Sequence, residues 1–294
     1  MIFCTYLETP PIRWCAPAVL AASLFLVACE EDSYQPNPEP TSGQSALNET
    51  SAPAALGQST ESYFAAPKII NYGPVLSNSA ATGPCFSDGD IVVETDDNDR
   101  ISQITYNACS EDFGPGFSSL TTGVVTFEYD GMDTLVRLTM DDFSEDTVLG
   151  DDHQIIRFDG VMDFPDGPVS PPSYTANGDY QFIRAFPSDN QNVEMGFEDF
   201  QVRSSVSGTD IIQIMNGHIT LPGSNRYLTV DTGNDGLRRP SGSSCAIAGT
   251  LTLIATDGSH TSATFNGEDH IVVSVNGVAQ SERTCDEYLA FIDS

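Results

Sequence analysis

Two related stretches, VRLTMDDF (136–143) and VEMGFEDF (193–200), decide how this chain folds. In both, apolar and polar residues alternate until an acidic pair precedes Phe143 or Phe200. Alternation with a period of two is typical of antiparallel strands that have one buried face. One extra residue at the acidic pair shifts the alternation, which predicts a β-bulge or the end of the strand.

A second pair of stretches shows that the similarity is a duplication. IIRFDG (155–160) is followed 56 residues later by IIQIMNG (211–217), in the same order as the first pair. A unit of about 55 residues therefore occurs at least twice, at about 123–165 and 178–221, and each copy holds a long hairpin and the next strand. We expect such units to continue one antiparallel meander.

Turn signals are frequent between the predicted strands. Asp-Gly and Asn-Gly pairs favour the type I′ turns of β-hairpins, because both central residues need positive φ. Ten glycines are preceded by Asp or Asn and are predicted to lie in turns: Gly89, Gly131, Gly160, Gly167, Gly178, Gly217, Gly236, Gly258, Gly267 and Gly277. The predicted fold is all-β, an antiparallel meander of repeated hairpins curling into a sandwich or incomplete barrel. Helices are expected only near 67–75 and at Asp286 to Ile292.

The N-terminal region carries an export signal. The apolar run at 16–28 is shorter than the roughly 20 residues that a membrane-spanning helix needs, but it fits a signal peptide. Leu26-Val27-Ala28-Cys29 resembles the lipobox of bacterial lipoproteins. The resemblance implies cleavage before Cys29, lipidation of Cys29 as the new N-terminus, and, with Glu30 next, delivery to the outer membrane of a Gram-negative bacterium. The alternative is an ordinary secretory signal that ends near a chance cysteine.

Composition divides the remaining chain into two parts. Residues 29–67 are rich in Pro, Ser, Thr and Glu and lack periodic apolar positions, so we expect a disordered tether behind the signal peptide at 1–28. Residues 68–294 form the predicted all-β domain. The whole chain has a net charge of −31, which comes mainly from scarce Lys and Arg. Such a charge excludes nucleic acid as a partner, and we expect membrane contact through the lipid alone.

Four cysteines remain in the predicted domain: Cys85, Cys109, Cys245 and Cys285. An even number in an exported chain predicts disulfides, with three ways to pair them. We favour the two local pairs, Cys85–Cys109 and Cys245–Cys285. A four-cysteine metal site is the alternative, but no C-x₂-C pair supports it. The body also resembles uncharacterised Gram-negative lipoproteins, through the segments CFSDGD (85–90), NAC (107–109) and GVVTF (123–127). That resemblance implies no known activity.

Candidate sites are sparse. Asp96, Asp97 and Asp99 form a weak candidate for calcium, although an EF-hand loop would place its acids at alternating positions. The pair Arg238-Arg239 is a weak candidate for an anion or a partner, or else it pairs with nearby acids. Two further groups are most simply solvent-facing: the acids Asp141, Asp142, Glu145, Asp146, Asp151 and Asp152, and the histidines His153, His218, His260 and His270.

These features favour a non-enzymatic lipoprotein that acts as a structural or binding module of the envelope, with no cofactor beyond weakly bound calcium. A surface protein that binds carbohydrate, lipid or calcium is the alternative, and a hydrolase ranks third. The single tryptophan, Trp14, lies in the predicted signal peptide. Sugar stacking would therefore depend on tyrosines, of which the candidates are Tyr72, Tyr106, Tyr174, Tyr180 and Tyr227.

Overall fold

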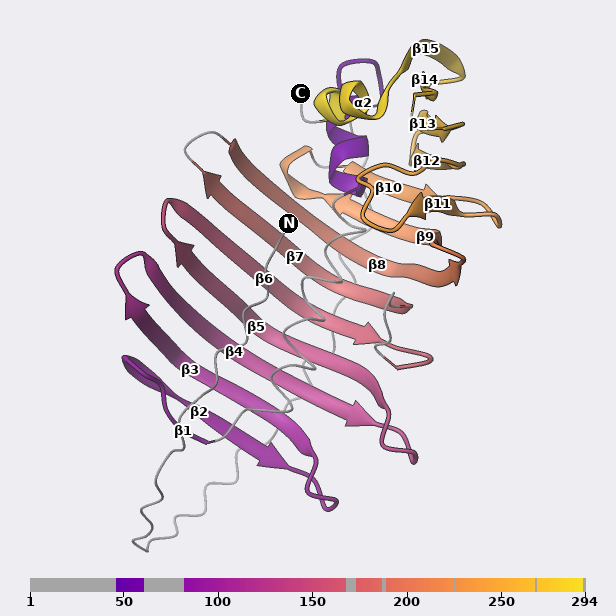
Figure 1. Cartoon of the computed structure of the whole chain (residues 1–294). Helices are drawn as coiled ribbons and strands as arrows, with labels where there is room; N and C mark the ends of the chain where they lie inside the picture. Colours follow the sequence, from indigo (N-terminus) through magenta and orange to yellow (C-terminus); the bar gives the residue numbers. More distant parts are fainter. Residues whose placement is uncertain are drawn as a thin grey trace, which may run out of the picture. The chain divides into compact units, whose positions relative to one another are not determined.

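The protein is built on one antiparallel β-sheet, as the period-two pattern predicts. The computed structural model describes residues 46–60, 82–167, 173–186, 189–224, 226–267 and 269–292. Strands lie next to one another in chain order along the 15-stranded sheet, which makes it a meander (Figure 1). The strands at the two ends of this order, β1 and β15, are not paired with each other, so the sheet is not closed into a barrel.

The strands lengthen in the region that holds the duplication. The elements are β1 (Gly83–Pro84), β2 (Asp88–Thr95), β3 (Ile101–Gly114), β4 (Phe117–Tyr129), β5 (Leu135–Leu149), β6 (Asp152–Asp163), β7 (Tyr174–Phe186), β8 (Asp189–Ser207), β9 (Asp210–Leu221), the 3₁₀ turn η1 (Pro222–Ser224), β10 (Arg226–Asp231), β11 (Leu237–Pro240), β12 (Gly249–Ala255), β13 (His260–Phe265), β14 (Ile271–Val275), β15 (Val278–Arg283) and α2 (Cys285–Ile292). β9 pairs with both β10 and β11, and β10 continues the sheet to β12.

The two predicted irregularities are β-bulges. β5 and β8 contain the repeated stretches, and their pairing shifts register between Met140 and Phe143 and between Glu198 and Gln201. Both strands run on past the acidic pair, so the pair does not end them. The side chains that flank each bulge, Met140 with Phe143 and Phe197 with Phe200, all point to the buried face. The bulge thus absorbs the extra residue and keeps both halves of the strand facing the core.

A line of unusual backbone conformations crosses the sheet at the height of these bulges. Each strand from β2 to β9 has a residue with positive φ in its interior at this height, and register places each close to the next. We call this set the bulge line; its members are Gly89, Ala108, Gly123, Asp142, Gly160, Gly178, Asp199 and Gly217. A bulge bends its strand and increases the local twist, so a line of them bends neighbouring strands at the same place.

The bulge line corrects the interpretation of four glycines as turns. Gly89, Gly160, Gly178 and Gly217 lie inside β2, β6, β7 and β9. A Cβ on Gly217 would lie 2.4 Å from the carbonyl oxygen of Asp199, so close backbone approach adds to the need for positive φ. Other glycines among the ten predicted to lie in turns, such as Gly131 and Gly277, do lie in turns between strands.

The core lies along one face of the sheet, which we call the inner face. Alternate residues of the strands supply it, including Ile104, Leu138, Phe158, Tyr180 and Met195, each at most 1% exposed. The opposite, outer face carries the polar partners in the alternation, such as Asp159 and Asp179. One face buried and one solvated is the usual arrangement of an antiparallel sheet.

The C-terminal helix agrees with the expectation for Asp286 to Ile292. α2 begins with a reciprocal cap, in which Thr284 N–H donates to Glu287 and Glu287 N–H donates to the Thr284 hydroxyl. Both predicted disulfides are present: Cys85–Cys109 joins the start of β2 to β3, and Cys245–Cys285 joins the segment before β12 to α2. Tyr288 of α2 packs edge-on against Phe265 of β13, with ring centroids 5.5 Å apart.

Part of the predicted tether is folded, so the expectation of disorder over 29–67 is wrong for residues 46–60. Residues 52–60 are helical, and Asn48 caps the helix by accepting hydrogen bonds from Thr50 and Ser51 N–H. Leu47 and Leu56 are buried in the same core as the sheet. The Leu47 backbone is held by Ser259 and Asn276. The buried apolar residues of this segment, Leu47, Ala52, Ala55 and Leu56, lie among polar residues. The composition of the segment therefore does not indicate that it folds.

Several expectations fall on residues that the structure does not describe. Cys29, the predicted signal peptide, Tyr72 and the helix predicted near 67–75 all lie outside the described residues. Among the helices within the described ranges, none is long and apolar enough to cross a membrane.

Candidate functional site

The outer face has two hollows near the bulge line, and strand β8 contributes to both. The first hollow has a volume of about 540 Å³ and extends across β5 to β8. Its lining mixes apolar and aromatic residues (Phe143, Phe158, Tyr180, Met195 and Pro222) with seven polar ones: Asp142, Ser144, Arg157, Asp159, Asp179, Gln181 and Glu194. Arg157 donates to the amide oxygen of Gln181 at 2.9 Å, so the one guanidinium in this lining is bound to a neutral side chain on the next strand.

Two carboxylates in the first hollow face each other across neighbouring strands. Asp159 of β6 and Asp179 of β7 are direct register partners. Partial burial, followed by the charges of Asp142 and Asp141, raises the pKa of Asp159. Partial burial, followed by the charges of Asp159 and Glu194, raises the pKa of Asp179. Like charges opposite each other destabilise a sheet, so this part of the outer face is electrostatically strained at neutral pH.

The bulges themselves are held by side chains from adjacent strands. The Asp159 carboxylate accepts a hydrogen bond from Asp142 N–H. In the second copy, the Asn177 side chain accepts one from Asp199 N–H at 2.8 Å. A bulge leaves a backbone group outside the ladder, and each of these side chains supplies the missing partner.

The second hollow lies across β8, β9 and β10 and has a volume of about 480 Å³. Its lining is polar but less charged than that of the first: Asp199, Gln201, Asn216, Gly217, His218, Thr229, Val230 and Asp231. Asp231 accepts a hydrogen bond from Gly233 N–H in the turn that follows β10. Asp199 stands at the bulge, so the hollow opens where β8 departs from regular pairing.

An aromatic pair stands at the edge of the second hollow. The rings of His218 and Tyr227 are stacked, with centroids 5.0 Å apart and planes 25° apart. His218 Nδ1 lies 3.2 Å from the Thr229 hydroxyl, and the Tyr227 hydroxyl donates to Glu198 at 2.9 Å. These contacts fix the orientation of both rings on the surface of the sheet.

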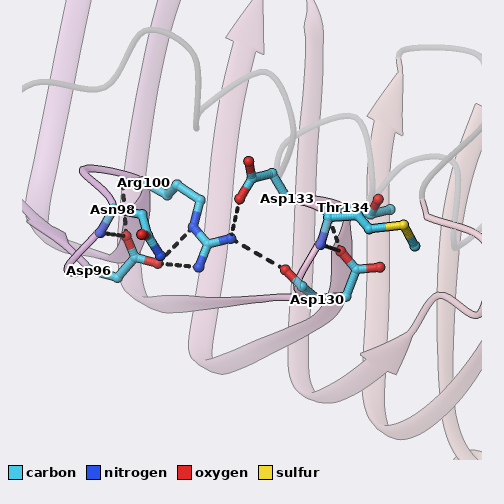
Figure 2. Close-up of polar contacts among 7 residues, drawn as sticks. Asp96, Asn98, Arg100, Asp130, Asp133 and Thr134 are labelled. Atoms are coloured by element: carbon cyan, nitrogen blue, oxygen red, sulfur yellow. Dashed lines mark hydrogen bonds and ion pairs between the residues drawn. The ribbon is translucent and has the colours of Figure 1, made fainter.

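The predicted calcium loop is occupied by its own arginine. Asp96 accepts hydrogen bonds from the backbone N–H groups of Asn98 and Arg100 and from Arg100 Nε (Figure 2). Arg100 also reaches Asp133 at 2.7 Å, and so joins the β2–β3 turn to the β4–β5 turn. The guanidinium hydrogen bond, followed by those of the backbone amides, lowers the pKa of Asp96. Asp97 and Asp99 are exposed beside this network.

The other acidic and histidine candidates are distributed over separate places. His153 lies 2.6 Å from Asp146, and His270 lies 2.8 Å from Glu282. His260 opens β13 while His270 precedes β14, which places them at opposite ends of one hairpin. Asp152 accepts hydrogen bonds from Arg184 on β7.

The arginine pair lies on β11 with its two side chains bound differently. Arg238 lies 3.6 Å from Asp210 of the neighbouring strand β9, and Arg239 donates to the carbonyl of Ser243 at 2.7 Å. The acidic partner of Arg238 therefore lies on the adjacent strand β9 and not next to Arg238 in the sequence.

Sequence reasoning missed the second hollow and its aromatic pair. The sequence predicts that His218 is simply solvent-facing, because no second histidine follows or precedes it at the spacing of a known motif. The register that brings Glu198, His218 and Thr229 into one row depends on the bulge in β8, which moves the partner of every later residue. A useful signal was present in the repeat, since Asn216 and His218 replace Asp159 and Val161 of the first copy.

Within the described residues, no group of three or more His, Cys, Asp or Glu side chains is arranged to hold a metal ion. Comparison of the chain with protein-family models, with curated proteins and with solved structures finds no match.

Proposed function

We propose that the protein is a lipid-anchored, non-enzymatic module of the Gram-negative outer membrane, which presents the outer face of its sheet to a ligand in the envelope. The observation that carries the proposal is the sequence Leu26–Cys29 behind a short apolar run. Acylation at more than one position would hold such a chain firmly in a leaflet, because each buried CH₂ contributes about 0.8 kcal/mol.

The arrangement of polar residues supports a binding role over catalysis. Among the described residues, the lining of the first hollow contains four carboxylates but no histidine. His153 and His270 are each paired with an acid elsewhere. A rigid sheet with two disulfides and polar hollows on its solvated face is suited to hold a ligand in a fixed orientation.

Membrane fractionation of the natural host tests the proposal. Wild-type protein should sediment with the outer membrane and be released by detergent, whereas Cys29→Ser should lose this association. Cys15→Ser is the matched control, because it removes a cysteine upstream of the cleavage site and should leave anchoring unchanged. An unchanged distribution for Cys29→Ser would overturn the proposal.

A further inference from the structure

We infer that the second hollow binds a neutral oligosaccharide, with Gln201, Asn216 and Asp199 bound to its hydroxyls and the ring of His218, which is stacked on Tyr227, packed against a sugar ring. The inference rests on the proposed function, since it names the ligand class of the same outer face. Its evidence is the chemistry of the lining, the rigidity of the aromatic pair and the difference between the two copies of the repeat.

The hollow is lined by solvent-facing hydrogen-bonding side chains. Asp199 and Gln201 of β8 line the hollow together with Asn216 of β9, which is the register partner of Gln201. Among the described residues, these three side chains have no hydrogen-bond partner. A carboxylate accepts from two hydroxyls, and a primary amide both donates and accepts. Adjacent hydroxyls of a sugar ring present this mixture of donors and acceptors.

The aromatic pair adds an apolar surface at the edge of the hollow: His218 lines the hollow, and Tyr227 is stacked on the His218 ring. Tyr227 is fixed at its hydroxyl by Glu198, and His218 is fixed at Nδ1 by Thr229, so neither ring has to be ordered on binding. When Thr229 donates to Nδ1, Nε2 carries the ring proton and becomes a further donor. Aromatic rings with a polar end suit a ligand that has both apolar faces and hydroxyl edges.

The two copies of the repeat differ in the charge of the residues that line their hollows. Asn216 stands where the first copy has Asp159, and His218 stands where it has Val161. The first hollow therefore combines Arg157 with crowded carboxylates, whereas the lining of the second has two aspartates and no Lys or Arg among the described residues. This difference favours an uncharged polar ligand at the second hollow, because fewer ionised groups must be desolvated on binding.

Calorimetric titration of the full-length mature protein in detergent tests the inference. The probes are maltohexaose, cellohexaose and chitohexaose, three neutral hexasaccharides of different linkage or substitution. We expect at least one to bind, and Asn216→Ala to weaken its affinity at least tenfold. Asn216→Asp, which keeps the shape of the side chain and removes its donor, should also weaken binding. Asp166→Ala, at an exposed residue in the turn after β6 and in the lining of neither hollow, is the control and should leave affinity unchanged.

Two results would overturn the inference: no saturable binding of any probe at concentrations up to 5 mM, or binding that both Asn216 variants leave unchanged. Either result with protein that carries lipid at Cys29 overturns the glycan site alone. Glycan binding by protein that carries no lipid would instead overturn the membrane anchor and keep the site.

Discussion

Asp142 and Asp199 adopt the same left-handed backbone conformation, with φ of 48° and 47°, at positions 57 residues apart in the sequence. The two bulges differ in which neighbouring strand supplies the facing glycine and which supplies the side chain that accepts a hydrogen bond from the aspartate N–H. Asp142 faces a glycine, Gly123, on the preceding strand, and its N–H is bound by Asp159 on the following strand. Asp199 faces Gly217 on the following strand, and its N–H is bound by Asn177 on the preceding one. Duplication thus conserved the bulge while its surroundings diverged.

The glycine opposite the second bulge should be essential for the fold. Gly217→Ala would place a Cβ 2.4 Å from the Asp199 carbonyl oxygen at a φ of 124°. We expect it to lower the free energy of unfolding by about 2 kcal/mol or more. Gly131→Ala is the control, because nothing lies within 4 Å of its added Cβ, and its stability should change by at most about 0.5 kcal/mol. Equal denaturation midpoints for the two variants would refute the role of the bulge line.

The opposed carboxylates should make stability fall as pH rises through the acidic range. Burial and neighbouring acids raise the pKa of Asp159 and Asp179 in the folded state, so the folded protein binds more protons than the unfolded chain. Stability therefore decreases from about pH 3.9, the unfolded pKa, up to the raised folded pKa, and the penalty is complete above it.

Asp179→Asn should consequently stabilise the protein at pH 7, by about 0.2–1 kcal/mol, and the gain should vanish below about pH 3.9. Chemical denaturation at several pH values measures it. Asp163→Asn is the opposite control, because Asp163 accepts a hydrogen bond from Arg137 at 2.6 Å and its neutralisation should be destabilising at pH 7. A loss of stability in Asp179→Asn at pH 7 would contradict the assignment of strain to this pair.

The helix at 52–60 should resist removal. Leu56 is fully buried, so Leu56→Ala should cost about 2–4 kcal/mol through lost packing and the cavity it leaves. Limited proteolysis of the mature protein should cut before residue 46 and spare 46–60. The exposed control Glu49→Ala should change neither result. Rapid cleavage within 52–60 of the wild-type protein would restore the expectation of a longer tether.

The structure of the Asp96 loop should depend on Arg100 and not on calcium. Because Arg100 donates a hydrogen bond to a carboxylate oxygen of Asp96 that would otherwise coordinate a cation, millimolar calcium should leave the thermal midpoint of the wild type unchanged. Arg100→Met should lower the protection of the Asn98 amide against hydrogen exchange, while Arg203→Met on β8 should not. A calcium-dependent rise in the wild-type midpoint that Asp96→Asn abolishes would count against this assignment.

The same sequence signals predicted some features correctly and others wrongly, for physical reasons. Alternation in VRLTMDDF and VEMGFEDF predicted strands, and the broken alternation predicted their bulges, because burial on one face fixes parity. The Asp-Gly pair at Gly160 was misread as a turn, since positive φ serves a bulge as well as a hairpin. The outer-face hollows could not be predicted, because the neighbours of Asn216 depend on register across three strands.

The mass of the mature N-terminus tests the central claim most directly. Intact-mass and peptide-level mass spectrometry of protein purified from membranes should find a chain that begins at Cys29 and carries both a thioether-linked diacylglyceryl group and an amide-linked acyl chain. A chain that begins at another residue, or a Cys29 that carries no lipid, would contradict it.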